Sequence, residues 1–320
     1  MNKSLSIIVP CFNEEEVIVE SYKRIKDVLS KLDYPTEIIF INDGSIDKTE
    51  QLLTSFSEID NSVKIISFSR NFGHQKAVTA GLNNCTSDMA VIIDADLQDP
   101  PELIPEMIKT MEDSGAQVVY CVRKSRKGEG LFKKITAKFF YRSMNFFSET
   151  KLPVDTGDFR LLDKSIIREF NRMPEKGKYI RGLVSWVGFK QVPFYYERDA
   201  RFAGDTKYPF SKMLKFATTS ILYFSSKPLK IATTLGFFSV IIALGLATWS
   251  IIGKVMGFTH ADSGWTSLFV LIIFFGGIQL LTIGIIGAYI GNLFDEIKNR
   301  PEYIIKHKKN FDNIDDETTN

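Results

Sequence analysis

Two long apolar stretches in the last third of this 320-residue chain set the strongest limit on its fold. Residues 231–252 and 268–290 are nearly uncharged, and each supplies the roughly 20 residues that cross a lipid bilayer. The preceding residues have the mixed composition of a water-soluble domain. We therefore predict a membrane protein whose N-terminal two-thirds is soluble.

The N-terminus and the cysteines favour a cytosolic location for that soluble part. The apolar run at residues 5–9 is too short for a signal peptide, and no small-residue cleavage site follows it. Cys11, Cys85 and Cys121 show neither paired nor metal-ligand spacing, which is typical of reduced thiols. The net charge of +2 gives no indication of nucleic-acid binding.

Short β-rich runs alternate with helical patterns along the soluble part. The predicted strands are residues 5–9, 37–41, 63–68, 89–93 and 117–121, and the predicted helices are residues 14–32, 47–56, 75–83 and 102–113. This alternation predicts an α/β fold with a mostly parallel sheet that is covered on both faces. Ligands of such sheets bind at the carboxyl ends of the strands.

The fourth predicted strand ends in a group of oxygen-bearing side chains, Asp94, Asp96, Gln98 and Asp99. In an extended chain, Asp94 and Asp96 would point the same way and could share one cation. Oxygen ligands favour Mg²⁺ or Mn²⁺ over zinc. The alternative is a solvated acidic turn before a helix that starts near Pro101.

Polar residues also follow the first three predicted strands. Glu14 and Asp43 could accept hydrogen bonds from a base or a ribose, and Lys76 follows the third strand. Taken singly, these are an ordinary helix start, an Asp-Gly turn and a solvated lysine. Together with the acidic run they predict a nucleotide pocket at one edge of the sheet.

Several motifs carry a resemblance to a known family. V-P-C-F-N-E, I-N-D-G-S-I-D-K-T, R-N-F-G-H-Q-K-A-V-T-A-G-L and D-A-D-L-Q-D-P-P resemble the GT-A (Rossmann-like) nucleotide-sugar domain of family 2 inverting glycosyltransferases. G-D-F-R-L-L-D, R-G-L-V-S-W-V-G-F-K-Q and R-F-A-G-D-T-K-Y are similar to the bacterial polyprenyl-phosphate (bactoprenol) glucosyltransferases, relatives of dolichol-phosphate mannose synthase. The resemblance runs from about residue 5 to residue 303.

The resemblance implies a role for each matching residue. Asp158 and Asp96 would be catalytic, and Asp94, Asp96 and Gln98 would hold the metal and the diphosphate. The nucleotide would be bound by Pro10, Phe12, Glu14, Asp43, Lys76 and Asp94. The phosphates of donor or acceptor would meet Arg123, Lys133, Arg201 and Lys207.

Two of these roles have alternatives. Arg201 and Lys207 could meet anionic lipid head groups as well as substrate phosphate. Asp158 could be the N-cap of a helix over residues 159–170. If Asp158 is catalytic, it need not remove a proton, because a phosphate monoester with a second pKa of about 6 is already largely ionised at neutral pH.

Amphipathic patterns and charge predict the membrane arrangement. Residues 131–147 fit an interfacial helix or a core helix, and residues 209–230 fit a juxtamembrane helix. A cytoplasmic GT-A domain over residues 1–208 would precede spans at 231–253 and 267–291, an external loop at 254–266 and a cytoplasmic tail at 292–320. Lysine and arginine flank the two spans and are almost absent from the loop, which predicts that both termini are cytoplasmic.

The resemblance implies transfer of a hexose, most simply glucose from UDP-glucose, to undecaprenyl or another polyprenyl phosphate for modification of the cell envelope. The same reaction could use UDP-N-acetylhexosamine, GDP-mannose or a UDP-aminoarabinose derivative. A non-catalytic membrane scaffold with a nucleotide-binding domain is a third hypothesis. Glycines in the second span, together with the resemblance, imply a homo-oligomer.

Overall fold

The computed structural model describes residues 3–123, 156–197, 225–256 and 265–311. These form two compact units. Unit 1 holds the described residues up to 197 together with those from Pro301 onward, and unit 2 holds those between 225 and 300. The predicted helix at 131–147 and most of the predicted juxtamembrane helix lie outside the described residues, as do Lys133, Arg201 and Lys207.

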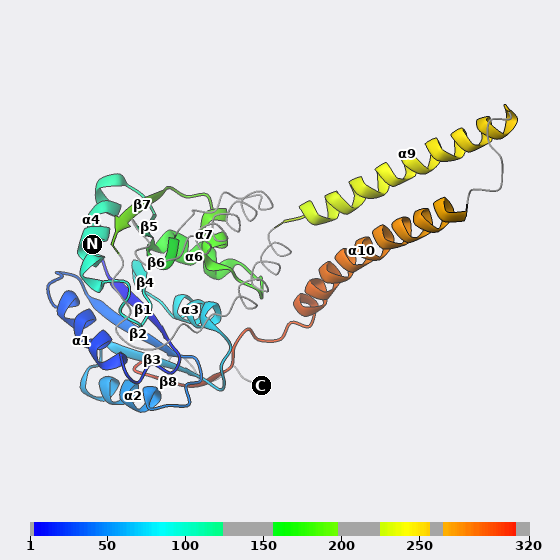
Figure 1. Cartoon of the computed structure of the whole chain (residues 1–320). Coiled ribbons are helices and arrows are strands. Elements are labelled where there is room, and N and C mark those ends of the chain that lie inside the picture. Colours follow the sequence, from blue (N-terminus) through cyan, green and yellow to red (C-terminus); the bar gives the residue numbers. More distant parts are fainter. Residues whose placement is uncertain (1–2, 124–155, 198–224, 257–264, 312–320) are drawn as a thin grey trace. The chain divides into compact units, whose positions relative to one another are not determined.

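Unit 1 is built on one eight-stranded sheet (Figure 1), in the order β7-β5-β6-β4-β1-β2-β3-β8. Strands β1 to β5 and β7 run in one direction, and β6 and β8 run against their neighbours, which confirms the mostly parallel α/β fold. The strands are β1 Leu5–Cys11, β2 Thr36–Asn42, β3 Val63–Phe68, β4 Met89–Ile92, β5 Val118–Arg123, β6 Thr156–Asp163, β7 Gln191–Tyr196 and β8 Ile305–Lys309.

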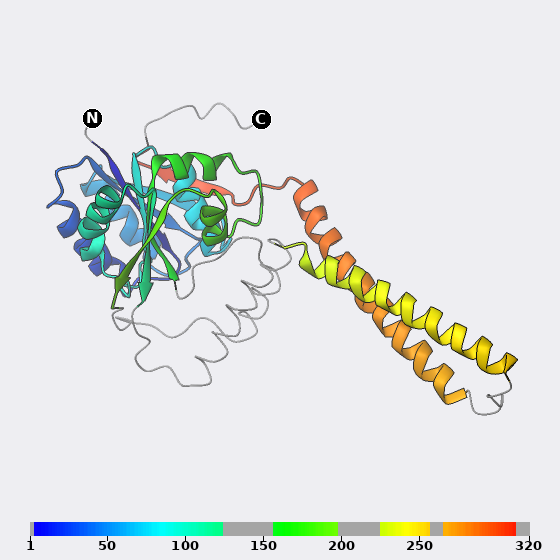
Figure 2. The same ribbon diagram turned by 90° about the horizontal axis from the view of Figure 1, so that it is seen from above.

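Helices cover both faces of this sheet (Figures 1 and 2). Alternate residues of β1 point to opposite faces, so Ile7 joins the core under α1, α2 and α4, while Ile8 faces α3. The helices of unit 1 are α1 Ile18–Leu29, α2 Thr49–Ile59, α3 His74–Asn83, α4 Ile104–Ser114, α6 Lys164–Arg172 and α7 Ile180–Trp186, with a short 3₁₀ turn η1 at Pro101–Leu103.

Helix α3 lies close to the sheet because its contact residue is a glycine. A Cβ atom at Gly81 would lie 2.4 Å from Cγ2 of Ile8 and 3.0 Å from Cδ1 of Ile41. A larger side chain would push the helix away from the strands. The close approach at Gly81 therefore sets the distance between α3 and the sheet. The first turn of α3, which carries His74 and Gln75, lies at the carboxyl edge of the sheet.

The described residues of unit 2 form two long helices that pack side by side, α9 (Lys227–Val255) and α10 (Trp265–Ile297) (Figure 2). Both are long and apolar enough to cross a membrane. A Cβ atom at five glycines of α10 would meet no described atom within 4 Å, so these glycines do not serve packing between α9 and α10: Gly276, Gly277, Gly284, Gly287 and Gly291.

After α10 the chain returns to unit 1. Strand β8 pairs antiparallel with β3 and completes one edge of the sheet. From the sequence alone, this segment is expected to be part of the cytoplasmic tail over residues 292–320. It is instead a strand of the same sheet that carries the motifs of the first 100 residues.

Candidate active site

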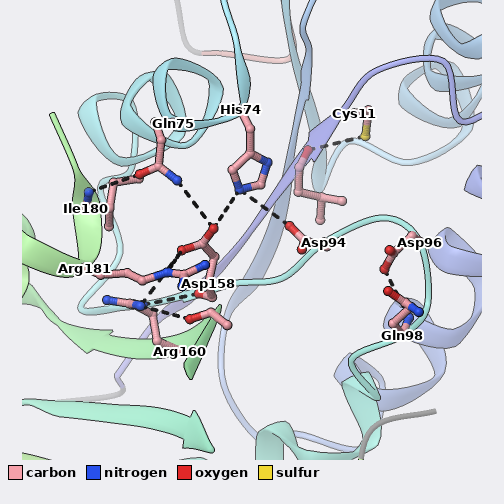
Figure 3. A network of polar contacts seen from close by, with 12 residues as sticks. Cys11, His74, Gln75, Asp94, Asp96, Gln98, Asp158, Arg160, Ile180 and Arg181 are labelled. Carbon is pink, nitrogen blue, oxygen red and sulfur yellow. Dashed lines mark hydrogen bonds and ion pairs between the residues drawn. The ribbon is translucent and has the colours of Figure 1, made fainter. Parts of the chain in front are cut away.

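The acidic run after β4 lies in a turn and not in an extended strand. Strand β4 ends at Ile92, and Leu97 adopts a left-handed conformation with φ of 59°. Figure 3 shows Asp94 pointing toward His74 and Asp96 toward Gln98, whose backbone N–H donates to Oδ1 of Asp96 at 3.2 Å. The expectation that an extended chain aligns the two carboxylates is therefore wrong, although both lie at the predicted sheet edge.

Asp158 reaches that edge from the antiparallel strand β6. Because Ile92 of β4 pairs with Arg160 of β6, the start of β6 lies beside the carboxyl end of β4. The alternative role of Asp158 as a helix N-cap is wrong. Helix α6 begins at Lys164 and is capped by Asp163, whose Oδ1 accepts from the backbone N–H of Ser165 at 2.9 Å.

The Asp158 carboxylate is held by two cationic side chains and one amide. The Nε atom of Arg181 donates to Oδ1 of Asp158 at 2.7 Å, and Nη1 of Arg181 donates to the carbonyl of Thr156 at 2.7 Å. On the other oxygen, Nε2 of His74 lies at 3.1 Å and Nε2 of Gln75 at 3.4 Å. Burial opposes ionisation of Asp158, but Arg181 and His74 hold its pKa well below the usual range.

His74 lies between Asp158 and Asp94, since its Nε2 atom is also 3.7 Å from Oδ1 of Asp94. Burial lowers the pKa of His74, but the carboxylates of Asp94 and Asp158 outweigh this and raise it to about 9. Burial raises the pKa of Asp94 to about 6, against the effect of His74 and with the help of the carboxylates of Asp158, Asp99 and Asp96. The site therefore concentrates negative charge around one imidazolium.

Gln75 and Arg160 complete the network around Asp158 (Figure 3). The side-chain oxygen of Gln75 accepts from the backbone N–H of Ile180 at 3.1 Å, which joins the first turns of α3 and α7. Arg160 is buried and donates to the carbonyls of Asp158 at 3.3 Å and Gly157 at 3.1 Å. Sequence reasoning assigned no role to these residues, nor to His74 and Arg181, although all four lie within the motifs that carry the resemblance.

The predicted nucleotide residues lie at the same edge, and Asp43 has a defined structural task there. Its Oδ1 accepts from the backbone N–H of Phe72 at 2.6 Å and its Oδ2 from that of Gly73 at 2.9 Å. Burial raises the pKa of Asp43, and these two hydrogen bonds oppose the shift. Each oxygen can still accept a further hydrogen bond from a ligand.

The other nucleotide candidates differ in their surroundings. Pro10 is buried within β1. Phe12 and Glu14 follow β1, and the backbone N–H of Glu14 donates to Oγ1 of Thr49 at 2.9 Å. Lys76 lies in the first turn of α3, with Nζ 6.0 Å from the centre of the Phe72 ring.

Arg123 ends β5 in a buried polar cluster. A Cβ atom at Gly157 would lie 2.9 Å from Nη2 of Arg123 and 3.8 Å from Oδ2 of Asp99, and the Tyr196 hydroxyl donates to Oδ1 of Asp99. Burial lowers the pKa of Arg123, but Asp99 and Tyr196 outweigh it and raise the value. Arg123 is therefore a charged group that interacts with Asp99 of the acidic run and Tyr196 of β7.

The donor set fits a hard divalent cation. Oδ1 of Asp94 is a buried oxygen with no hydrogen-bond partner among the described residues. Asp94, Asp96 and Gln98 offer oxygen ligands only, which suits Mg²⁺ or Mn²⁺.

Known proteins resemble this chain over nearly its whole length. The profile of Glycosyl transferase family 2 matches residues 6–170. The uncharacterized glycosyltransferase YkcC of Bacillus subtilis (strain 168) is 48% identical over 96% of this chain and 95% of its own length. A prophage bactoprenol glucosyl transferase homolog of Escherichia coli (strain K12) is 41% identical over 95% and 99%, and the bactoprenol glucosyl transferase of Shigella phage SfII is 39% identical over 94% and 97%. Since the similarity extends over nearly the whole chain, this protein belongs to glycosyl transferase family 2.

Proposed function

We propose that this glycosyltransferase moves a glucosyl group from UDP-glucose to undecaprenyl phosphate or a similar polyprenyl phosphate. The observation that carries the proposal is the Asp158 carboxylate, which Arg181 and His74 hold in its ionised form beside the acidic run. The choice of donor and acceptor is supported by the two relatives named as bactoprenol glucosyl transferases or their homologs. The product would be a lipid-linked monosaccharide for modification of the cell envelope.

The proposed chemistry is a single displacement with inversion. A phosphate oxygen of the acceptor forms a bond to the anomeric carbon while the bond from that carbon to the nucleoside diphosphate breaks. The acceptor oxygen is already ionised near neutral pH, so no side chain has to remove its proton. A fixed negative charge at Asp158 stabilises positive charge that develops on the sugar, and its ion pairs keep it from being protonated.

A divalent cation would be held by Asp94, Asp96 and Gln98. When bound, it supplies positive charge that stabilises the departing diphosphate. Arg123 would add a second positive charge near that edge, and Lys133, Arg201 and Lys207 are proposed to meet the phosphates of donor or acceptor. The nucleoside would lie among the residues that follow β1 and β2, namely Phe12, Glu14 and Asp43, with Lys76 nearby.

The helices of unit 2 are proposed to cross the membrane twice, with the catalytic domain and both termini in the cytoplasm. Chain connectivity supports an even number of spans, because the chain leaves unit 1 before α9 and rejoins its sheet as β8 after α10. The lysines that flank α9 and α10 support the cytoplasmic side. The glycines of α10, which are not packed against α9, support association between copies of the chain.

The test is transfer of sugar by the purified protein in detergent. Radiolabelled UDP-glucose, UDP-N-acetylglucosamine, GDP-mannose and a UDP-aminoarabinose derivative are each incubated with undecaprenyl phosphate and Mg²⁺ or Mn²⁺, with an EDTA control. We expect a chloroform-soluble product from UDP-glucose that is lost with EDTA and with Asp96→Ala. A product from a different donor alone would overturn the sugar assignment. Equal activity of wild type and Asp96→Ala, or no lipid product from any donor, would overturn the proposed reaction.

A further inference from the structure

The segment that returns from α10 makes specific contacts with the loop that follows β3. The ring of Tyr303 stacks on that of Phe68, with centroids 4.9 Å apart and an angle of 14° between the planes. The carbonyl of Ile304 accepts from the backbone N–H of Ser69 at 3.0 Å, and the Asn83 amide donates to the Tyr303 hydroxyl at 3.0 Å. The segment therefore fixes the last residue of β3 and the first residue of the next loop.

The same segment contacts a second loop, which precedes α7. The Nζ atom of Lys178 lies 3.8 Å from Oε1 of Glu302, and these side chains are only 5% and 14% exposed. Lys178 also lies over the ring of Phe170, with Nζ 5.0 Å from its centre. A charge pair with so little exposure is sensitive to the loss of either partner, because the remaining charge would stay buried.

Both contacted loops lead directly to the residues that hold Asp158. From Ser69 the chain continues through Phe72 and Gly73, which donate to Asp43, into His74 and Gln75. From Lys178 it continues to Ile180, which donates to Gln75, and to Arg181, which donates to Asp158. Residues 302–304 thus contact both loops that lead to the partners of the Asp158 carboxylate.

We propose that Glu302 and Tyr303 are positioning residues for the transfer reaction and hold the His74 and Arg181 sides of the site in register. The proposal rests on the proposed function for its effect on catalysis, whereas its effect on the two loops is independent of that function. A direct consequence is that the chain immediately following the second apolar helix forms part of the support of the active site.

The competing explanation is that residues 301–310 only cover the edge of the sheet and add general stability. Strand β8 offers a matched control, because Lys309 belongs to the same segment but lies 3.8 Å from Glu58 at the exposed surface. Lys309→Ala removes a charge from β8 without touching either loop. Tyr303→Phe is a second matched variant, since it keeps the ring that stacks on Phe68 and removes only the hydroxyl.

The first experiment is hydrogen exchange on the full-length protein in detergent, which requires no activity. For Tyr303→Ala and Glu302→Gln we expect amide exchange to accelerate by about 10-fold or more in peptides that cover residues 69–76 and 178–184, and to stay at the wild-type rate in α1. Lys309→Ala should match wild type in all three regions. Unchanged exchange in both loops, or equal acceleration throughout the sheet, would overturn the proposal.

The second experiment measures kcat and KM for the donor that wild type accepts. Wild-type turnover tests the proposed function, and the variants test this inference, so the two can fail separately. We expect kcat to fall by about 10- to 100-fold in Tyr303→Ala and Glu302→Gln at wild-type levels of folded protein, with Tyr303→Phe and Lys309→Ala close to wild type. A kcat equal to that of Lys309→Ala in both variants would contradict a positioning role. If Tyr303→Ala does not fold, Glu302→Gln decides the matter by the same criteria, with Tyr303→Phe and Lys309→Ala as its controls.

Discussion

The Nε2 atom of His74 lies 3.1 Å from Oδ2 of Asp158, so the first residue of α3 contacts a carboxylate delivered by β6, 84 positions later in the chain. The same imidazole lies 3.7 Å from Asp94. The positively charged imidazole of His74 therefore lies between two carboxylates, one in the acidic run and one on the residue proposed to face the sugar.

Arg181→Lys should impair turnover more than binding. The guanidinium group contacts both Asp158 and the Thr156 carbonyl, and a lysine ammonium on a flexible stem cannot reproduce this planar pair of contacts. We expect kcat to fall by about 10- to 100-fold. The control is Arg172→Lys, at an exposed position of α6. A kcat for Arg181→Lys that equals the control value would show that Asp158 does not need this support.

His74→Ala should lower kcat by about 10-fold or more, because Asp158 loses a charge-assisted hydrogen bond in a buried site. His74→Gln should retain more activity than His74→Ala, since an amide can still donate to the carboxylate. His307→Ala provides the comparison at another histidine, which belongs to β8 and lies near Glu50 of α2. The reverse order, with His74→Gln less active than His74→Ala, would argue against the hydrogen bond as the relevant interaction.

Gly44→Ala should destabilise the protein and raise the KM for the donor. A Cβ atom at Gly44 would lie 2.4 Å from the carbonyl carbon of Arg70 and 2.6 Å from the backbone nitrogen of Asn71, in the loop that Asp43 holds. We expect a loss of about 1–3 kcal/mol from this overlap, in addition to the strain of φ at +67°. Gly115→Ala has a similar φ of +62° and meets no described atom within 4 Å, so it measures the backbone term alone. Equal destabilisation by the two variants would contradict this prediction, because it would mean that the loop around Arg70 and Asn71 moves to accept the Cβ atom at no cost.

Asp60 should make stability depend on pH at the acidic end. It contacts Lys26 at 2.7 Å and Ser62, and although burial opposes ionisation these partners lower its pKa from 3.8 to about 2. Its contribution, at most about 2 kcal/mol, is complete above the unfolded value and is lost as the pH falls through about 2. The thermal midpoint of Asp60→Asn should lie below that of wild type at pH 6 and approach it below pH 3. A constant difference across this range would contradict the ion pair as its cause.

Much of the fold could be predicted because the first five strands are apolar runs separated by helical periodicity. Strand β6 was missed because it carries Asp158 and Arg160 inside the sheet. There Asp158 pairs with Arg181 of α7, and Arg160 donates to carbonyls of its own strand. Strand β8, I-K-H-K-K, has the composition of a solvated tail. It becomes a strand by pairing with β3, and Lys306 and Lys309 lie near Glu50 and Glu58 on α2.

The sequence predicted the position of a site residue only where that residue directly follows a single apolar strand. Asp94, Asp96 and Asp43 each follow an apolar run, so their place at the carboxyl edge could be inferred. The contacts of His74, Gln75 and Arg181 with Asp158 join three separate segments of the chain. Such contacts cannot be predicted from local sequence patterns. The turn that begins at Ala95 and directs Asp94 and Asp96 to different neighbours likewise depends on packing, because Ala95 and Leu97 are buried.

An isosteric substitution tests whether an ionised Asp158 stabilises the transfer of glucose to a lipid phosphate. We would measure initial rates of radiolabelled glucosyl lipid formation by wild type, Asp158→Asn and Asp163→Asn at saturating UDP-glucose. Asp163 lies on the same strand, and an asparagine there can still cap α6. We expect Asp158→Asn to lose about 100-fold or more in rate and Asp163→Asn to stay near wild type. A rate for Asp158→Asn within about 2-fold of wild type would contradict it, because an electrostatic role of this size cannot survive removal of the charge.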